Sequence, residues 1–196
     1  MEKIPTLFVC TYDRQNCHIT PEVNPACAWV LAGEGKAYPK YDGTACLVKN
    51  GKLFARYDAK RGKTPPLGAI PCQDPDPITG HWPHWVEVTA DNPQYKWHWR
   101  CWDNWDYRGE KPKDGTYELI GPHFQGNPHG VPFDYFMEHE GNIFTELRVE
   151  RSFEGIRNFL STFNKEGIVF WHSDGRKAKI RRDHFGFAWP ITSNPF

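Results

Sequence analysis

The sequence lacks any long hydrophobic run. Its 196 residues have a mean hydropathy of -0.70, and no apolar stretch approaches the roughly 20 residues that a membrane-spanning helix needs. The first 15 residues, MEKIPTLFVCTYDRQ, contain one short apolar stretch with charges soon after it, so they do not resemble a signal peptide. We therefore expect a soluble cytoplasmic protein with no membrane partner.

The sequence also lacks net charge, with 24 basic and 24 acidic residues. This balance argues against a protein that binds nucleic acid by bulk electrostatics alone. The distribution is uneven, however, because five of the seven residues from 176 to 182 are basic. This segment is either a local positive patch or an ordinary solvated strand face.

The cysteines do not indicate a disulfide framework, because the chain shows no secretion signal. Free reduced thiols are expected for all six, which are Cys10, Cys17, Cys27, Cys46, Cys72 and Cys101. Cys10 with Cys17-His18, and His81 with His84, both lack a second pair at zinc-site spacing. They are interpreted as core or surface residues rather than metal ligands.

No internal repeat or low-complexity linker divides the chain, so we expect a single domain over residues 1–196. Apolar positions alternate on both sides of Asn50-Gly51, a dipeptide that fits a tight hairpin turn because both residues accept a positive φ. A second hairpin is predicted around residues 173–175, a strand over 115–121, and a helix over 152–163 with Ser152 as its cap. The fold class is therefore α+β, built of antiparallel sheets with few helices.

Residues 72–109 differ from the rest of the chain in composition, because they contain six of the nine tryptophans. In the favoured interpretation, the indoles of this strand-poor stretch form a small core of their own. The alternative is that they stack nucleic-acid bases beside Lys96 and Arg100.

The second hairpin carries a row of cations. In RKAKIRR, the side chains of Lys177, Lys179 and Arg181 fall on one face of the strand. Such a row can hold an anion such as phosphate. It would also assist a nucleophilic lysine, because a free lysine has a pKa of about 10.4 and attacks only in its neutral form. Lys40, immediately before a Tyr-Asp-Gly turn, is the candidate nucleophile.

Two glutamates are candidates for holding Mg²⁺ beside a phosphate group. Glu118 lies in the middle of the predicted strand TYELIG, and Glu166 directly precedes the apolar strand in EGIVF. Carboxylate oxygens suit Mg²⁺, which neutralises charge during phosphate chemistry. For each glutamate the alternative is an exposed strand carboxylate.

The segments around Lys40, Glu118, Glu166 and Lys177 resemble the motifs of a known superfamily. KYDG, at residues 40–43, resembles the KxDG motif of the covalent nucleotidyltransferase superfamily, which includes ATP-dependent DNA and RNA ligases and GTP-dependent mRNA capping enzymes. FARYD, YELIG, EGIVF and KAK resemble its following motifs in the same order. KIPTLFV, PEVNPACAWVLAGEG, ITGHWPHW, GTYELIGPHFQGNP and DHFGFAWP extend the resemblance over nearly the whole chain, to the compact ATP-dependent 5′-to-3′ RNA ligase family found in bacteria, phages and animals. Residues 72–109 then resemble a tryptophan-rich family insertion.

The resemblance implies an adenylyltransferase domain, the ATP-grasp-like catalytic domain of such ligases, and a three-step reaction. Lys40 attacks the α-phosphate of ATP and gives lysyl-AMP and pyrophosphate. AMP then moves to a 5′-phosphate RNA end, and a 3′-hydroxyl displaces it and joins the strands, as RNA repair requires. The implied substrates are ATP and RNA with 5′-phosphate and 3′-hydroxyl ends, the implied cofactor is Mg²⁺ or Mn²⁺, and no obligate protein partner is evident.

The resemblance also implies residue roles. Lys40 is the catalytic nucleophile, and Asp42 sets the turn that positions it. Glu166 is the main metal ligand and Glu118 the second. The implied ATP-binding residues are Lys40, Gly43, Arg56, Glu118, Glu166, Lys177 and Lys179. Phe136 or Phe133 is suggested to cover the adenine face.

Larger relatives append an OB-fold domain after the fifth motif. Only 17 residues follow Lys179 here, so no OB-fold domain is expected, and Arg61, Arg181 and Arg182 are the cations proposed to hold RNA. Two other functions stay open. One is a GTP-using or protein-modifying nucleotidyltransferase on the same scaffold, and the other is a non-catalytic nucleic-acid-binding domain.

Overall fold

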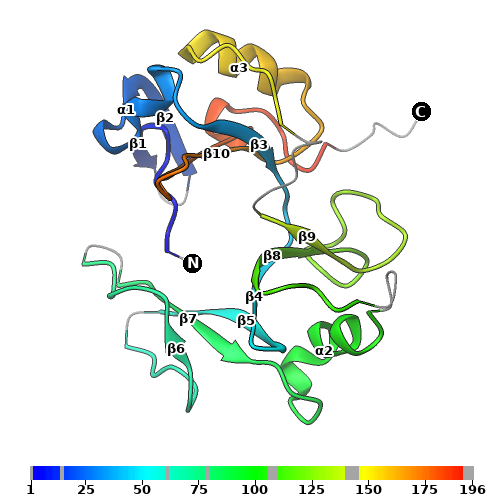
Figure 1. Cartoon of the computed structure of the whole chain (residues 1–196). Coiled ribbons are helices and arrows are strands. Elements are labelled where there is room, and N and C mark those ends of the chain that lie inside the picture. Colours follow the sequence, from blue (N-terminus) through cyan, green and yellow to red (C-terminus); the bar gives the residue numbers. More distant parts are fainter. Residues whose placement is uncertain are drawn as a thin grey trace. The chain divides into compact units, whose positions relative to one another are not determined.

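The chain divides into two compact units in the computed structural model, which describes residues 2–13, 16–60, 62–77, 80–105, 110–139 and 146–191. Unit 1 comprises Met1–Glu2 and Gly43–Gly141, and unit 2 comprises Lys3–Asp42 and Asn142–Phe196. Antiparallel strands dominate both units (Figure 1), which confirms the α+β class. The single domain expected from the sequence stays a prediction. No helix within the described ranges is long and apolar enough to cross a membrane.

Unit 1 is built on a six-stranded antiparallel sheet with strand order β6-β7-β5-β4-β8-β9. Its strands are β4 (Thr44–Lys49), β5 (Lys52–Ala59), β6 (Ile70–Pro71), β7 (Trp82–Glu87), β8 (Gly115–Ile120) and β9 (Tyr135–Glu138). The 3-10 helix η2 (Pro93–Tyr95) leads into α2 (Lys96–Asp103), so the tryptophan-rich stretch contains both a strand and a helix. The predicted turn between β4 and β5 is confirmed, because Asn50 and Gly51 have φ angles of 53° and 70°.

The two faces of this sheet differ in chemistry. Cys46, Ala55 and Leu119 are fully buried on one face, where Cys101 and Trp102 of α2 join the same hydrophobic cluster. Side chains alternate along a strand, so Arg56 and Glu118, each next to a core residue in sequence, belong to the opposite face. The sequence pattern of β5 and β8 therefore places two predicted nucleotide-binding residues on one side of the sheet.

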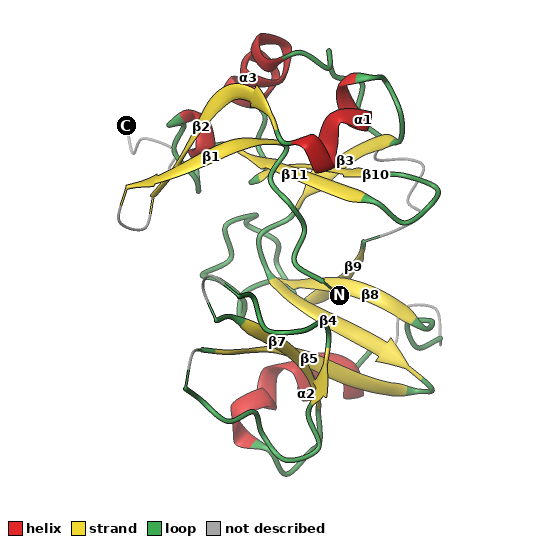
Figure 2. Ribbon diagram, turned by 90° about the vertical axis from the view of Figure 1, so that its left-hand side faces the viewer, coloured by secondary structure: helices red, strands yellow, loops and turns green. Residues whose placement is uncertain are grey.

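Unit 2 combines a two-stranded sheet, β1-β2, with a three-stranded antiparallel sheet, β11-β10-β3. Its elements are β1 (Phe8–Asp13), β2 (Asn16–Val23), η1 (Pro25–Cys27), α1 (Ala28–Leu31), β3 (Lys36–Lys40), α3 (Phe153–Thr162), β10 (Gly167–Trp171), β11 (Lys177–Arg181) and η5 (Asp183–Phe185). The second hairpin of the sequence prediction is thus confirmed as β10 and β11. Figure 2 shows α1 and α3 on the same side of the three-stranded sheet.

The helix predicted over 152–163 is confirmed as α3. Its N-terminus is capped by Ser152, whose Oγ accepts a hydrogen bond of 3.0 Å from the Gly155 N–H. Ile156 and Leu160 are fully buried and belong to the same cluster as Ile168 and Phe170 of β10. One face of the three-stranded sheet is therefore a hydrophobic core, and its other face is free to carry charged side chains.

The expectation of free thiols is wrong for one pair. Cys10 and Cys17 form a disulfide across the β1-β2 hairpin, with Cα atoms 5.7 Å apart. Pairing of the two antiparallel strands brings the cysteines within the usual disulfide range. The sequence argument considered only whether the chain is exported, and not how close the two cysteines lie. The other four cysteines, Cys27, Cys46, Cys72 and Cys101, are free.

Candidate active site

Lys40 is the last residue of β3, on the charged face of the three-stranded sheet of unit 2. Its Nζ lies 2.5 Å from Oε2 of Glu166. The two meet because β3 pairs with β10 so that Lys40 lies opposite Gly167, the residue after Glu166. Glu166 is buried, and burial raises the pKa of its carboxyl, while the neighbouring Lys40 acts in the opposite direction. The structure thus joins the predicted nucleophile to the predicted metal carboxylate.

The cation row predicted on β11 is confirmed. Lys177, Lys179 and Arg181 are half-buried on one face, and the two residues between them are fully buried on the other. Burial is the main reason that the pKa of Lys179 is lowered to about 8, with Lys40 and Arg181 as further causes. The face therefore presents clustered positive charge that an anion would relieve.

The register of the sheet decides which cations lie near the Lys40 end. Arg181 lies opposite Gly167, as Lys40 does from the other side, and its Nη1 is 3.7 Å from Glu166 Oε1. Lys177 is at the other end of β11, with its Nζ 4.0 Å from the ring centre of Trp171. Arg181, proposed from the sequence for RNA, thus contacts the Lys40 partner, whereas Lys177 contacts a tryptophan.

Three further predicted residues of this region have different outcomes. Arg182 is buried, and its Nη1 donates to the carbonyl oxygens of Leu160 and Phe163 at the end of α3, so an exposed RNA contact does not fit it. Arg61 lies outside the described residues. Asp42 Oδ2 accepts a 2.8 Å hydrogen bond from Trp189 Nε1, and its role in positioning Lys40 stays a prediction.

The remaining predicted nucleotide-binding residues belong to unit 1. The Gly43 N–H donates a 3.1 Å hydrogen bond to Glu118 Oε1, and Glu118 Oε2 lies 2.9 Å from His139 Nε2. A Cβ at position 43 would overlap the backbone of Leu119, so glycine lets β4 and β8 approach closely here. Arg56 pairs with Asp58 at 2.9 Å. The unit boundary falls between Asp42 and Gly43, so the KYDG motif contributes to both units.

The register of β9 does not support Phe136 as the aromatic over adenine. Phe136 pairs with Leu119 and is buried in the core of unit 1, whereas Met137 pairs with Glu118 and shares its face. Phe133 is 65% exposed but precedes β9. Neighbouring residues of a strand point to opposite faces, so Phe136 and Glu118 lie on different sides of the sheet.

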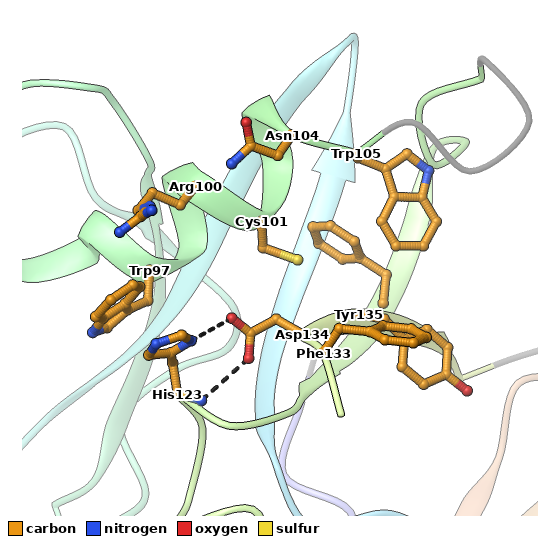
Figure 3. A pocket seen from close by; sticks show the side chains of 10 residues that line it. Trp97, Arg100, Cys101, Asn104, Trp105, His123, Phe133, Asp134 and Tyr135 are labelled. Atoms are coloured by element: carbon orange, nitrogen blue, oxygen red, sulfur yellow. Dashed lines mark hydrogen bonds and ion pairs between the residues drawn. The ribbon is translucent and has the colours of Figure 1, made fainter. Parts of the chain in front are cut away.

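The tryptophans of α2 and its surroundings do not form a core of their own, as was expected from the sequence, because they pack into the hydrophobic cluster of the unit 1 sheet. Trp102 is buried in the cluster of unit 1, and Trp97, Trp99 and Trp105 pack against it. A cavity of about 1020 Å³ lies beside them, with Trp97 and the stacked His123 on one side and Trp105 and Phe133 on the other (Figure 3). Asp134 fixes His123, whose Nδ1 lies 2.6 Å from its carboxylate.

The sequence argument missed three polar residues of these sites. His139 contacts Glu118, and His184 Nε2 lies 3.1 Å from Arg181 Nε. Lys3 lines a cavity together with Lys179 and Arg181. Period-two spacing from Met137 would have placed His139 on the face of Glu118, but no local pattern indicates that Lys3 approaches β11.

The carboxylates of this site bear on whether it could hold a divalent metal. No group of three or more His, Cys, Asp or Glu side chains among the described residues is arranged to hold a metal ion. Mg²⁺ often takes one or two protein carboxylates and completes its shell with phosphate oxygens and water. The buried Glu166 carboxylate is suited to be such a ligand.

Fold and site together define an α+β protein with a lysine–carboxylate pair on a cationic sheet face. No protein-family model matches the chain. It is similar to a protein named RNA ligase 1 from Pongo abelii, at 29% identity over 78% of this chain and 67% of that protein. Proteins of the same name from Rattus norvegicus and Mus musculus are each 26% identical over 79% of this chain and 68% of their own length. These similarities support an RNA ligase family and an RNA ligase function in general.

Proposed function

We propose that the chain is an ATP-dependent RNA ligase that carries AMP on Lys40. The observation that carries the proposal is the 2.5 Å contact between Lys40 Nζ and Glu166 on a face that also holds Lys179 and Arg181. A lysine beside a carboxylate and clustered cations suits attack on a phosphate group. The proteins named RNA ligase 1 supply the substrate class, because their name specifies RNA.

The first step would form lysyl-AMP. Lys40 Nζ attacks the α-phosphorus of ATP, an N–P bond forms, and the bond to the β-phosphate oxygen breaks as pyrophosphate leaves with the electron pair. Glu166 is in hydrogen-bonding distance to take the proton from the Lys40 ammonium group. Lys179 and Arg181 would stabilise the negative charge on the phosphate oxygens as it redistributes. When bound, Mg²⁺ or Mn²⁺ would neutralise phosphate charge, with Glu166 as its protein ligand.

The later steps would move AMP to RNA. The 5′-phosphate of one RNA end attacks lysyl-AMP and frees Lys40, and the 3′-hydroxyl of the other end then displaces AMP. Glu118 and Arg56 on the unit 1 sheet would hold the ribose and a phosphate of the nucleotide. Glu118 has oxygen acceptors for ribose hydroxyls, and Arg56 offers a guanidinium with several donors.

Covalent labelling tests the proposal. Incubation with Mg²⁺ and ATP labelled in the α-phosphate should give a stable adduct that is absent in Lys40→Ala. Lys165→Ala is the matched control and should retain the label, because Lys165 is a nearby lysine over the Tyr41 ring of the same unit. If neither ATP nor GTP gave an adduct, the proposal that the chain is a nucleotidyltransferase would be rejected.

The acceptor is tested with the labelled protein. A 5′-phosphorylated RNA should remove the label and become joined to a 3′-hydroxyl RNA, whereas the same RNA with a 5′-hydroxyl should not. Labelling by GTP alone, or discharge by a protein and not by RNA, would replace the ligase with another nucleotidyltransferase. RNA binding without any adduct would leave a non-catalytic binding domain.

A further inference from the structure

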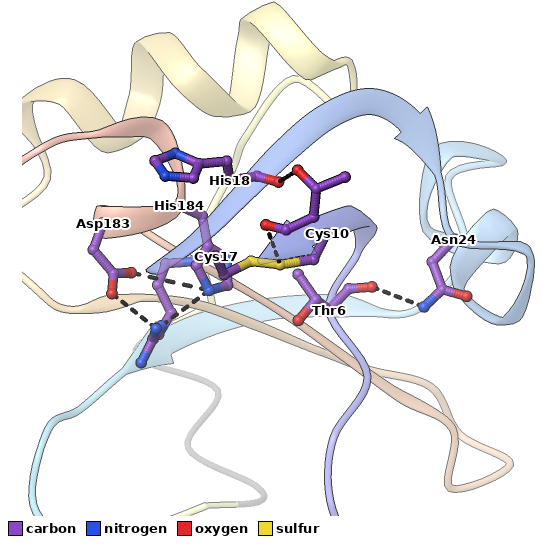
Figure 4. The surroundings of a disulfide bond; sticks show 9 residues. Thr6, Cys10, Cys17, His18, Asn24, Asp183 and His184 are labelled. Carbon is purple, nitrogen blue, oxygen red and sulfur yellow. Dashed lines mark hydrogen bonds and ion pairs between the residues drawn. A yellow bond between two sulfur atoms is a disulfide. The ribbon is translucent and has the colours of Figure 1, made fainter. Parts of the chain in front are cut away.

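A cavity of about 620 Å³ lies beside β11 in unit 2. Its polar lining consists mainly of Lys3, Thr6, Asn24, Lys179, Arg181 and His184. Figure 4 shows Thr6, Asn24 and His184 around the Cys10–Cys17 disulfide, whose two cysteines also line the cavity. The walls therefore come from the N-terminal segment, the β1-β2 hairpin, β11 and η5.

The cavity lies on the side of β11 that is away from Lys40. Lys40 is on β3, and β10 separates β3 from β11. The N-terminal segment borders the opposite edge of β11, where the Leu7 N–H donates to Lys179 O at 2.8 Å and the Lys179 N–H donates to Pro5 O at 2.9 Å. No lining residue comes from β3 or β10. Arg181, a lining residue, lies across from Lys40 with Gly167 between them, so a molecule that contacted both Lys40 and this cavity would pass Arg181.

The cavity is cationic. Three of its lining side chains, Lys3, Lys179 and Arg181, are basic, and none is acidic. Asp183 and Glu166 both pair with Arg181, at 2.8 and 3.7 Å, but neither lines the cavity. Within the described part of the chain, no carboxylate forms an ion pair with Lys179. The chemistry of the walls suits a compact anion of high charge.

We propose that this cavity binds the β- and γ-phosphates of the nucleoside triphosphate and then the free pyrophosphate, an inference that rests on the proposed function. In phosphoryl-type displacement the attacking and leaving groups are roughly in line. If Lys40 Nζ attacks the α-phosphorus from the β3 side of the sheet, the pyrophosphate leaves toward the β11 side, where this cavity lies. Lys3 and Arg181 hold the outer phosphates, and Thr6 and Asn24 offer hydrogen-bonding groups.

The number of charges favours pyrophosphate over the 5′-phosphate of RNA. Pyrophosphate carries more negative charge than a terminal phosphate, which has at most about two charges, so it gains more from a lining that contains basic and no acidic side chains. Both ligands share phosphate chemistry, so the experiment must separate them.

Reversal of the first step provides that test. Pyrophosphate added to preformed lysyl-AMP should regenerate ATP and remove the label. In Lys3→Ala the pyrophosphate concentration for half-maximal removal should rise about tenfold or more, as expected for one lost charge-assisted contact. Lys3→Arg should restore it, and Lys49→Ala, an exposed lysine of unit 1, should not change it. A larger effect of Lys3→Ala on discharge by 5′-phosphorylated RNA than on discharge by pyrophosphate would overturn the assignment.

A binding measurement keeps this inference separate from the proposed function. Inorganic pyrophosphate is titrated calorimetrically into Lys40→Ala, which cannot form an adduct and whose cavity lining is intact. Binding that weakens about tenfold in Lys40→Ala/Lys3→Ala supports the cavity even if no adduct forms with any nucleotide. Equal binding of pyrophosphate by both variants, or no binding by either, would refute the cavity as a pyrophosphate site. In that case an adduct in the unaltered chain would still support the ligase.

Discussion

Glu166 is the residue on which the most roles converge, because its carboxylate contacts both Lys40 and Arg181. If Glu166 has the two roles proposed for it, as proton acceptor and as metal ligand, Glu166→Gln should slow formation of the lysyl-AMP adduct by about 100-fold or more. The melting temperature should also fall, because Lys40 and Arg181 lose a buried charged partner, so adduct formation is compared at a temperature where both proteins are folded.

Adduct formation is measured with labelled ATP, and thermal unfolding is followed on the same samples. Glu154→Gln is the control, because Glu154 lies exposed on α3. An adduct rate within twofold of the unaltered chain in Glu166→Gln would contradict the role given to Glu166.

His98 makes the stability of unit 1 depend on pH. Burial lowers its pKa to about 4, and its Nε2 has no hydrogen-bond partner among the described residues. Between pH 4 and 6.5 the unfolded chain therefore binds a proton at this site that the folded chain does not, so stability falls as the pH is lowered. From pH 7.5 to 5 the loss is about 2 kcal/mol for this group.

Denaturant unfolding at the two pH values checks this expectation. The His98→Gln variant should lose about 2 kcal/mol less than the unaltered chain over this range, although it is less stable at pH 7.5 because ring contacts with Tyr95 and Phe124 are lost. An identical pH dependence in both proteins would show that His98 is accessible to protons in the folded state.

The positions of single residues were predictable where a local pattern marked them. Lys40 before its turn and the alternating cations of β11 were visible in the sequence, whereas the contact between Lys40 and Glu166 joins residues 126 positions apart. Strand pairing creates that contact, and no local pattern specifies which strands pair. The same reason explains why Lys3 and His184 carried no signal.

At the scale of elements, Gly167 sets how closely β10 and β11 approach beside the Lys40–Glu166 pair. A Cβ at this position would overlap the backbone of Ile180 and Arg181. Gly167→Ala should therefore cost about 1–3 kcal/mol of unfolding free energy and also reduce adduct formation, because Lys40 and Arg181 both lie opposite this residue.

The matched variant is Gly115→Ala in β8. There the nearest atom to an added Cβ is 3.7 Å away, an ordinary contact distance, so stability should change by no more than about 0.5 kcal/mol. Comparable losses in the two variants would mean that glycine is required in these strands for a reason other than close packing.

Elements were easier to predict than their register. The hairpin at Asn50-Gly51 and the helix capped by Ser152 follow from turn and capping chemistry that acts over a few residues. Local chemistry does not specify which residues of β9 face Glu118. Phe136 lies in the core, whereas the next residue, Met137, pairs with Glu118. Sequence alternation was weak there, since both residues are apolar.

At the scale of the whole molecule, the hydrophobic residues form two clusters that share no described member, one in each unit. From the length of the chain we expected a single core. The amino-acid composition does not change at the boundary between Asp42 and Gly43, so the sequence did not indicate a division there. Segments distant in sequence build unit 2, so the division becomes visible only in tertiary contacts.

Separate clusters predict separate local stabilities. Leu119 and Ile168 are each fully buried, one in each cluster, and truncation of either to alanine should cost about 2–5 kcal/mol from lost burial and the cavity left behind. Amide hydrogen exchange should accelerate in β4, β5 and β8 for Leu119→Ala and in β3, β10 and β11 for Ile168→Ala, because a cavity weakens first the elements that line it. The milder Ile168→Val should give the same pattern with a smaller amplitude. Acceleration spread evenly over both units in either alanine variant would show instead that the two clusters unfold as one cooperative core.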